Sequence, residues 1–151
     1  MQENTGLLIK KISDRLLSEL DYNLRKYDIT ARQLEVLDYI KENKNCSQKD
    51  LVEFFGIRHT TVIDLIKKLQ EKKLINKKQN KENAKSSVIT LTKKGQLLAD
   101  ELGNFRDDVE NIIAKGLGKE DKKALIYSLN IVYQNICEYE KNRIEVKDIW
   151  L

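Results

Sequence analysis

The stretch from residue 56 to residue 92 limits the fold most tightly, because a helical pattern there runs directly into a strand pattern. The helical part has apolar side chains three and four residues apart, which places them on one face: Val62, Leu65, Ile66 and Leu69. The opposite face receives polar side chains: Thr60, Asp64, Lys67 and Glu71. Such a helix has one face to bury in a core and one face to offer to a partner.

A pair of strands is predicted after this helix. Leu74 and Ile75 open a short apolar run, and the segment Ser87–Leu91 alternates β-branched residues in the manner of a strand. The segment between the two runs, residues 79–86, is too polar to build a core and is expected to be a turn. The sequence therefore predicts a helix followed by a two-stranded wing.

Positive charge is concentrated in the same stretch. Between Arg58 and Lys94 there are eleven Lys and Arg against three Asp and Glu, a net charge of +8, whereas the whole chain has only +4. Neutralising phosphates and releasing their counterions supplies most of the sequence-independent affinity for DNA. A lysine run by itself would more simply be a solvated face. Its position on a helix and a wing favours DNA as the partner.

The composition excludes several classes of protein. A chain of 151 residues with 40% apolar residues can bury the core of one domain without disulfide bonds. No apolar run approaches the roughly 20 residues that span a bilayer, and the N-terminus lacks the basic-then-apolar order of a secretory signal. We therefore expect a soluble, cytoplasmic protein.

The sequence predicts no enzyme, no cofactor and no metal site. Cys46 and Cys137 lie far apart without a CxxC pairing, and His59 has no ligand partners at a suitable spacing. A glycine-rich phosphate loop and a paired nucleophile and base are both missing from the sequence. Both cysteines are expected to be small, partly buried apolar residues in a reducing compartment.

Two helices are predicted directly before the central one. Thr30 and Gln33 have the spacing of a capping box, so the first of these helices begins after Thr30. Ser47 caps the second helix, which runs to about Phe55. This short helix is expected to bury three residues: Leu51, Phe54 and Phe55. Gly56 is expected to take the left-handed conformation that turns the chain into the central helix.

Longer helices are predicted towards both ends of the chain. One covers about residues 5–27, another begins after Thr92, and a last one begins near Glu120 after the break at Gly116-Leu117-Gly118. Each has an apolar stripe that needs a surface to pack on, which its own core or a second copy could supply. The fold class is therefore expected to be mainly α with a small β-wing: a winged helix-turn-helix with six helices.

Several short segments together resemble a known family. They are Leu34–Leu37, Ser47–Ile57, Thr61-Val62, Leu69, Leu74-Ile75 and Leu91-Thr92-Lys93-Lys94-Gly95. In this order, over about residues 30 to 98, the chain resembles the MarR family of bacterial winged-helix regulators. The resemblance implies a homodimer held by the N- and C-terminal helices that binds a pseudo-palindromic operator in double-stranded DNA, usually as a repressor. It also implies a small-molecule effector pocket between the dimer helices and the DNA-binding lobe.

The resemblance assigns regions and residues to these roles. Residues 31–95 would form the DNA-binding lobe, and residues 1–30 and 96–151 the dimerisation region, within a single structural domain. Contacts with DNA are expected from Arg58, His59, Thr60, Thr61, Ile63, Asp64, Lys67, Lys68, Lys81 and Lys85. Contacts with the second copy are expected from Leu8, Ile12, Leu16, Leu125, Leu129, Val132 and Ile136. Thr61 is equally suited to packing inside the helix-turn-helix.

Three positions depart from the family pattern. The wing has Asn83-Ala84-Lys85 where the family commonly has Asp-Arg-Arg, and a lysine can contact phosphate but lacks the planar fork of arginine. Lys73 replaces the usual glycine after the central helix. Asp64 would repel phosphate unless it accepts a hydrogen bond from a cytosine amino group. These departures leave open an alternative, a winged-helix module that binds a protein partner, with weak or no specific DNA binding.

Overall fold

The computed structural model describes residues 4–82 and 86–149. Their contacts divide the chain into two compact units, Met1–Gly103 and Asn104–Leu151, and each is described by itself. Lys85, one of the residues expected to contact DNA, lies outside the described residues.

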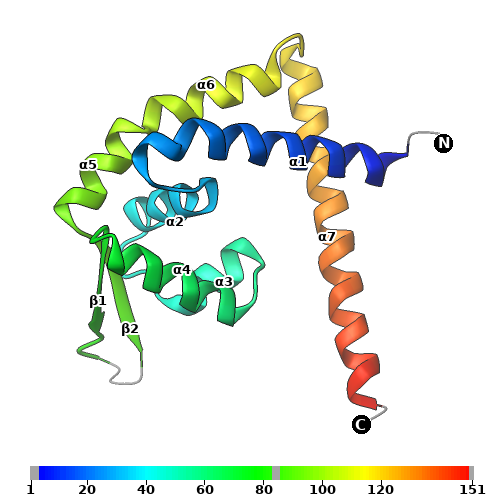
Figure 1. The fold of residues 1–151 in the computed structure, drawn as a ribbon. Coiled ribbons are helices and arrows are strands. Elements are labelled where there is room, and N and C mark those ends of the chain that lie inside the picture. Colours follow the sequence, from blue (N-terminus) through cyan, green and yellow to red (C-terminus); the bar gives the residue numbers. More distant parts are fainter. Residues whose placement is uncertain (1–3, 83–85, 150–151) are drawn as a thin grey trace. The chain divides into compact units, whose positions relative to one another are not determined.

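The first unit contains the helix-turn-helix, the wing and the helices next to them (Figure 1). Its elements are α1 (Thr5–Leu24), the 3₁₀ turn η1 (Arg25–Tyr27), α2 (Ala31–Glu42), α3 (Gln48–Phe55), α4 (His59–Glu71), β1 (Ile75–Gln79), β2 (Ser87–Leu91) and α5 (Lys93–Glu101). The two strands are antiparallel, with Ile75 opposite Leu91, and they project as a ribbon beside α4. We call α2, α3, α4, β1 and β2 together the winged lobe.

The local sequence signals set the helix ends as predicted. At the start of α2 the Thr30 hydroxyl accepts from the backbone N–H of Gln33, and the Gln33 side chain accepts from the backbone N–H of Thr30, both at 3.2 Å. Ser47 and Asp50 form the same reciprocal box at the start of α3. Gly56 ends α3 in the left-handed region, at φ 60°. Each arrangement satisfies backbone groups that a helix end leaves open.

The core of the first unit lies between α2, α4 and the wing. The predicted face of α4 is buried, and it packs against α3 and β1, while α2 packs against β2 and α5. Ile89 of β2 is buried as well, and so are the apolar residues of α4 and α2: Val62, Leu65, Ile66, Leu69, Leu34, Val36, Leu37 and Ile40. The Ile89 N–H donates to the carbonyl of Cys46 at 2.7 Å, so the segment before α3 also pairs with the wing. The core thereby fixes the wing relative to α4.

The predicted burial of Phe54 is wrong, because 61% of this side chain is exposed. Its ring lies against Tyr39 of α2, with the ring centroids 4.5 Å apart, and against half-buried Phe55 at 4.9 Å. The eight-residue helix α3 turns only Leu51 fully into the core, so the aromatic rings pack on one another at its edge. Such ring pairs stabilise beyond the area they bury.

A close approach between α5 and the end of α4 depends on Gly95. The Thr92 N–H donates to the carbonyl of Leu74 at 3.0 Å, and the Thr92 hydroxyl accepts from the Gly95 N–H at 3.0 Å while donating to the carbonyl of Lys73 at 2.7 Å. A Cβ atom built on Gly95 would lie 2.0 Å from the Leu74 oxygen. The run Leu91–Gly95 is therefore the joint between the wing and α5.

Lys73 occupies the left-handed position that ends α4. Its φ is 58°, its N–H donates to the carbonyl of Gln70 at 2.9 Å, and the Leu74 N–H donates to the carbonyl of Leu69 at 3.0 Å. These two hydrogen bonds form a Schellman motif, in which glycine is the usual residue at the left-handed position. The departure noted at Lys73 therefore places a side chain in a backbone region that disfavours one.

Replacing Lys73 with glycine is expected to raise the free energy of unfolding by about 0.5–1 kcal/mol, because the relief of left-handed strain exceeds the entropy that glycine adds to the unfolded chain. Thermal unfolding by circular dichroism measures the change. Lys49→Gly, at an exposed position inside α3, is the matched control and should lower stability by about 1 kcal/mol. Equal losses in the two variants would contradict the expectation.

The second unit is helical. It contains most of α6 (Gly103–Ala114) and all of α7 (Lys119–Ile149), joined through Gly116 at φ 85°. An ion pair between Lys122 and Glu110, 2.7 Å apart, links the two helices. The helix expected after the wing is present as α5 and α6, which meet at Leu102. If α5 and α6 are counted as one helix, the described part of the chain contains the six α-helices that the sequence predicts. The predicted fold class is confirmed.

None of the helices in residues 4–82 and 86–149 combines the length and the apolar character needed to cross a bilayer. The division into a DNA-binding lobe, residues 31–95, and a dimerisation region, residues 1–30 and 96–151, stays a prediction.

Cys46 lies in the core. Its burial, and to a smaller extent the nearby charge of Asp50, raise the pKa of its thiol from 9 to about 12. Burial disfavours the charged thiolate. Because the pKa of the thiol is higher in the folded than in the unfolded protein, the fold should lose stability as the pH rises from 9 towards 12.

Iodoacetamide at pH 8 should therefore modify half-buried Cys137 well before Cys46, and denaturant should remove the difference. Mass spectrometry of the two peptides measures both rates. Equal labelling of the two cysteines in the native protein would contradict this.

Candidate nucleic-acid interface

The exposed face of α4 brings together most of the side chains expected to contact DNA. Arg58 is the residue before the helix, and its side chain makes no capping hydrogen bond. The other members are all exposed along the helix: His59, Thr60, Thr61, Ile63, Asp64, Lys67 and Lys68. Their exposure follows from the burial of the opposite face, which turns this side of α4 to solvent.

The N-terminus of α4 suits a phosphate group. The first turn of the helix contains no acidic residue, and Arg58 stands directly before it. The free N–H groups and the positive end of the helix dipole both attract an anion there. Because Arg58 is exposed, its guanidinium can reach outward to such an anion.

Asp64 and Lys68 form an ion pair on the same face. Their charged atoms are 2.8 Å apart, one helical turn from each other. The hydrogen bond to Asp64 and its charge raise the pKa of the Lys68 amine. In the free protein the carboxylate thus already has a cationic neighbour, although 58% of the Asp64 side chain remains exposed.

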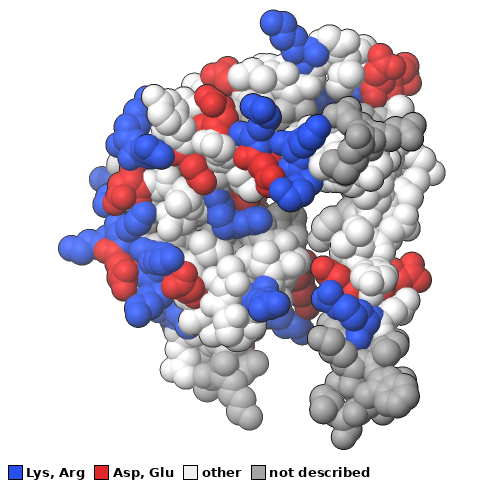
Figure 2. Space-filling view, turned by 45° about the vertical axis from the view of Figure 1, so that its right-hand side comes forward, with Lys and Arg blue, Asp and Glu red and all other residues white. Residues whose placement is uncertain are grey.

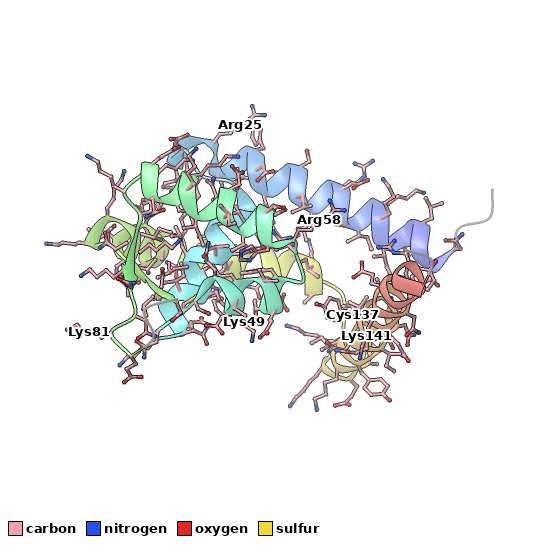
Figure 3. All side chains as sticks on the ribbon, turned by 90° about the horizontal axis from the view of Figure 1, so that it is seen from below. Arg25, Lys49, Arg58, Lys81, Cys137 and Lys141 are labelled. Atoms are coloured by element: carbon pink, nitrogen blue, oxygen red, sulfur yellow. The ribbon has the colours of Figure 1, made fainter. Side chains whose placement is uncertain are left out.

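The wing adds basic side chains beyond the helix. Lys81 is exposed after β1, while Lys77 and Lys78 are exposed on the strand itself. Lys77 and Lys78 were not among the residues predicted to contact DNA. Strand alternation alone would have placed only one of them outward, but a ribbon of two strands leaves both of its faces partly uncovered. In Figure 3, Arg58 and Lys81 lie at opposite ends of the winged lobe.

Two basic residues of the same stretch serve the fold. The Lys72 amine donates to the Gln33 side chain of α2 at 3.1 Å and to the carbonyl of Asp28, and so ties the end of α4 to α2 and to the segment before it. The Lys94 amine donates to the carbonyl of Lys72 at 3.0 Å. The net charge of this stretch therefore overstates what it can offer to a partner.

Acidic side chains lie among the basic ones on the molecular surface. Figure 2 shows Lys and Arg in several separate groups with Asp and Glu between them. Neighbouring groups of opposite charge partly cancel at a distance, so they favour contacts at fixed positions over a general attraction.

A groove of about 470 Å³ lies in the first unit, next to the C-terminal end of α4. Three leucines of its wall belong to the segment after α4 and to α5: Leu74, Leu97 and Leu98. The rest of its lining is Tyr27 with charged side chains of both signs: Asp28, Glu71, Lys72, Lys94 and Glu101. In the described part of the chain, no group of three or more His, Cys, Asp and Glu side chains could hold a metal ion.

The residues expected to contact a second copy lie on α1 and α7. On α1, Leu8 and Ile12 are exposed and Leu16 is half-buried. On α7, the exposed members are Leu125, Leu129 and Ile136, and Val132 is half-buried. Exposed apolar residues that form one contiguous patch often mark a site of protein–protein interaction. The contacts themselves stay a prediction.

Comparison with known proteins identifies the type of this winged lobe. The MarR family model matches residues 29–87. The chain is 27% identical to the HTH-type transcriptional regulator BilQ of Clostridioides difficile, over 72% of this chain and 74% of that one. It is 26% identical to the HTH-type transcriptional regulator SarZ of Staphylococcus haemolyticus, over 87% and 88% of the two chains. Both relatives are named as regulators of transcription and not as enzymes.

A solved structure of similar fold has been determined with DNA. It is a MarR family transcriptional regulator from Listeria monocytogenes, described as putative and complexed with a 26mer DNA, and it is 28% identical to this chain. The structural match covers 91% of each chain with a TM-score of 0.83.

Proposed function

Because this chain belongs to the MarR family of winged-helix proteins, we propose that it regulates transcription by binding a specific sequence in double-stranded DNA. The observation that carries the proposal is the exposed face of α4, where Arg58, Lys67 and Lys68 accompany side chains able to read bases. The similar Listeria protein was crystallised with a 26mer DNA, which supports DNA as the partner here.

The protein acts as a homodimer on a pseudo-palindromic operator. The exposed apolar residues of α1 and α7, among them Ile12, Leu125 and Ile136, support this assembly because a second copy would remove them from water. Two lobes related by a two-fold axis would read two half-sites in successive turns of the duplex. Bound over a promoter, the dimer blocks transcription and acts as a repressor in the bacterial cytoplasm, where the chromosome lies.

A small-molecule effector regulates this binding. The groove beside the end of α4 supports an effector site, because its wall contains leucines and its lining includes charged groups next to the end of α4, the proposed recognition helix. A ligand there would touch Glu71, the last residue of α4, together with Lys72 directly after it and with α5. Such a ligand could shift the equilibrium between two positions of the winged lobe only by binding one of these positions more tightly than the other.

A mobility-shift titration with the DNA upstream of the protein's own gene tests the proposal. We expect a shift at low salt that survives an excess of unrelated duplex, and a complex with two protein chains per site. A shift that unrelated DNA removes equally well would contradict sequence-specific binding. If no shift occurs even at low salt, the exposed face of α4 would instead serve a protein partner.

A further inference from the structure

We propose that Asp64 recognises a cytosine amino group in the major groove and is a specificity-determining residue. The inference rests on the proposed DNA binding and adds the base that the recognition helix selects. Asp64 places a carboxylate, which phosphates repel, within a surface otherwise suited to DNA.

Asp64 lies on the line of α4 that points most directly away from the core. At 3.6 residues per turn, the positions opposite the buried face are Thr60, Asp64, Lys67 and Glu71. Ile63 and Lys68 lie to either side of this line. Glu71 belongs to the last turn of the helix, whereas Asp64 stands near its middle. Asp64 is thus the acidic side chain that enters deepest wherever the helix enters a groove.

The centre of a helix in the major groove meets base edges. The groove is about 12 Å wide and a helix with its side chains is about 10–12 Å across, so the side chains at its flanks meet the phosphates. Lys68 is therefore placed towards one backbone, and Asp64 faces the floor of the groove. The repulsion that a carboxylate would suffer at the rim is reduced there, because the phosphates lie further away.

The chemistry of the groove floor leaves few partners for a carboxylate. An ionised carboxylate only accepts hydrogen bonds, and the donors on base edges are the amino groups of cytosine and adenine. In adenine the acceptor N7 stands beside the amino group and repels the second carboxylate oxygen, whereas cytosine has no such neighbour. Lys67, on the same line, only donates and suits the O6 and N7 atoms of guanine. A C·G pair satisfies both residues.

The ion pair with Lys68 prepares Asp64 for this contact. The pair holds the carboxylate at 2.8 Å from the amine while 58% of the Asp64 side chain stays exposed, so an oxygen remains accessible to a base. An ion pair this exposed contributes little to stability, which gives the fold small reason to keep an acid at this position. Lys68 acts here as a positioning residue.

Selection of bound duplexes from a random library, followed by sequencing, tests the proposal with the full-length protein. The wild type should enrich a motif with cytosine at one position of each half-site. Asp64→Ala should lose the preference at that position alone, a drop in discrimination of roughly 5- to 150-fold. Asp64→Asn should shift the preference to adenine, whose N6 and N7 match an amide. Lys68→Ala should lower the preference for cytosine in part, because the ion pair no longer holds the carboxylate. Lys81→Ala, the control, should weaken binding to all sequences and keep cytosine, because Lys81 is exposed on the wing and not on α4.

The outcomes separate this inference from the function on which it rests. If the Asp64→Ala motif matches the wild-type motif at every position, Asp64 reads no base and the inference fails, while sequence-specific DNA binding stands. A wild type that enriches no sequence overturns both. Thermal unfolding of the variants should match the wild type closely, because both side chains of the pair are more than half exposed, so altered motifs would not reflect lost structure.

Discussion

Replacing Gly95 with alanine is expected to lower the free energy of unfolding by about 3 kcal/mol, because the new methyl group would overlap with the backbone carbonyl of Leu74. A Cβ at this position would lie 2.0 Å from the Leu74 oxygen and 3.0 Å from its carbonyl carbon. Relief requires α5 to move away from the wing, which would break the hydrogen bond from the Thr92 N–H to Leu74. For a chain of this size the melting temperature should fall by about 6–12 °C.

Gly103→Ala is the matched control, since no atom lies within 4 Å of a Cβ built there. This variant should melt at or slightly above the wild-type temperature, because alanine favours a helix over glycine. Both variants must be compared at one protein concentration, since the proposed dimer would make the melting temperature depend on it. If Gly95→Ala has the same melting temperature as the wild type, the Leu74 backbone can move aside at little cost in free energy, and the expectation is contradicted.

Removing Arg58 and Lys81 together is expected to have the largest effect on DNA binding. The two residues lie at opposite ends of the winged lobe (Figure 3), so each would contact a different stretch of phosphate. Each lost contact flattens the slope of log affinity against log salt by about 0.9. The double alanine variant should therefore lose about 1.8 units of slope if one lobe binds, and about 3.6 if two lobes bind. At 0.1 M salt, affinity should fall roughly 60-fold or roughly 4,000-fold respectively.

Fluorescence anisotropy with a labelled duplex, over a series of salt concentrations, measures the slope. The control is Lys10→Ala with Arg25→Ala, which removes the same two charges from α1 and η1. Its slope should stay within about half a unit of the wild-type value, because general attraction between distant charges is screened. Equal slopes for the two double variants would place the phosphate contacts elsewhere. The value found for Arg58 and Lys81 also tells whether one or two lobes engage.

Stability should be unaffected in the Arg58 and Lys81 variant, which makes its binding data simple to interpret. The Arg58 side chain makes no capping hydrogen bond, and Lys81 is exposed after β1. Surface substitutions away from special features usually change the free energy of unfolding by no more than about 0.5 kcal/mol.

The amino-acid sequence by itself determined the elements of this fold, because its signals act over three or four residues. The capping boxes Thr30–Gln33 and Ser47–Asp50 begin two helices, and Gly56 ends one in the left-handed region. The spacing of apolar residues identified the buried face of α4, and the alternation in Ser87–Leu91 identified a strand. These features depend on neighbours along the chain, which a sequence displays directly.

Only the tertiary structure decided what each exposed or charged side chain does, because that depends on residues far away in the sequence. Lys72 is turned to Gln33 and the Asp28 carbonyl and leaves the basic surface, although its charge looks like that of Lys67. Phe54 packs against Tyr39 at the surface and does not enter the core. Gly95 has φ in the ordinary helical range of α5, and what makes a side chain impossible there is the Leu74 carbonyl, supplied by another element. A local pattern predicts that a side chain turns outward or inward, but the group it meets is set by how the elements pack.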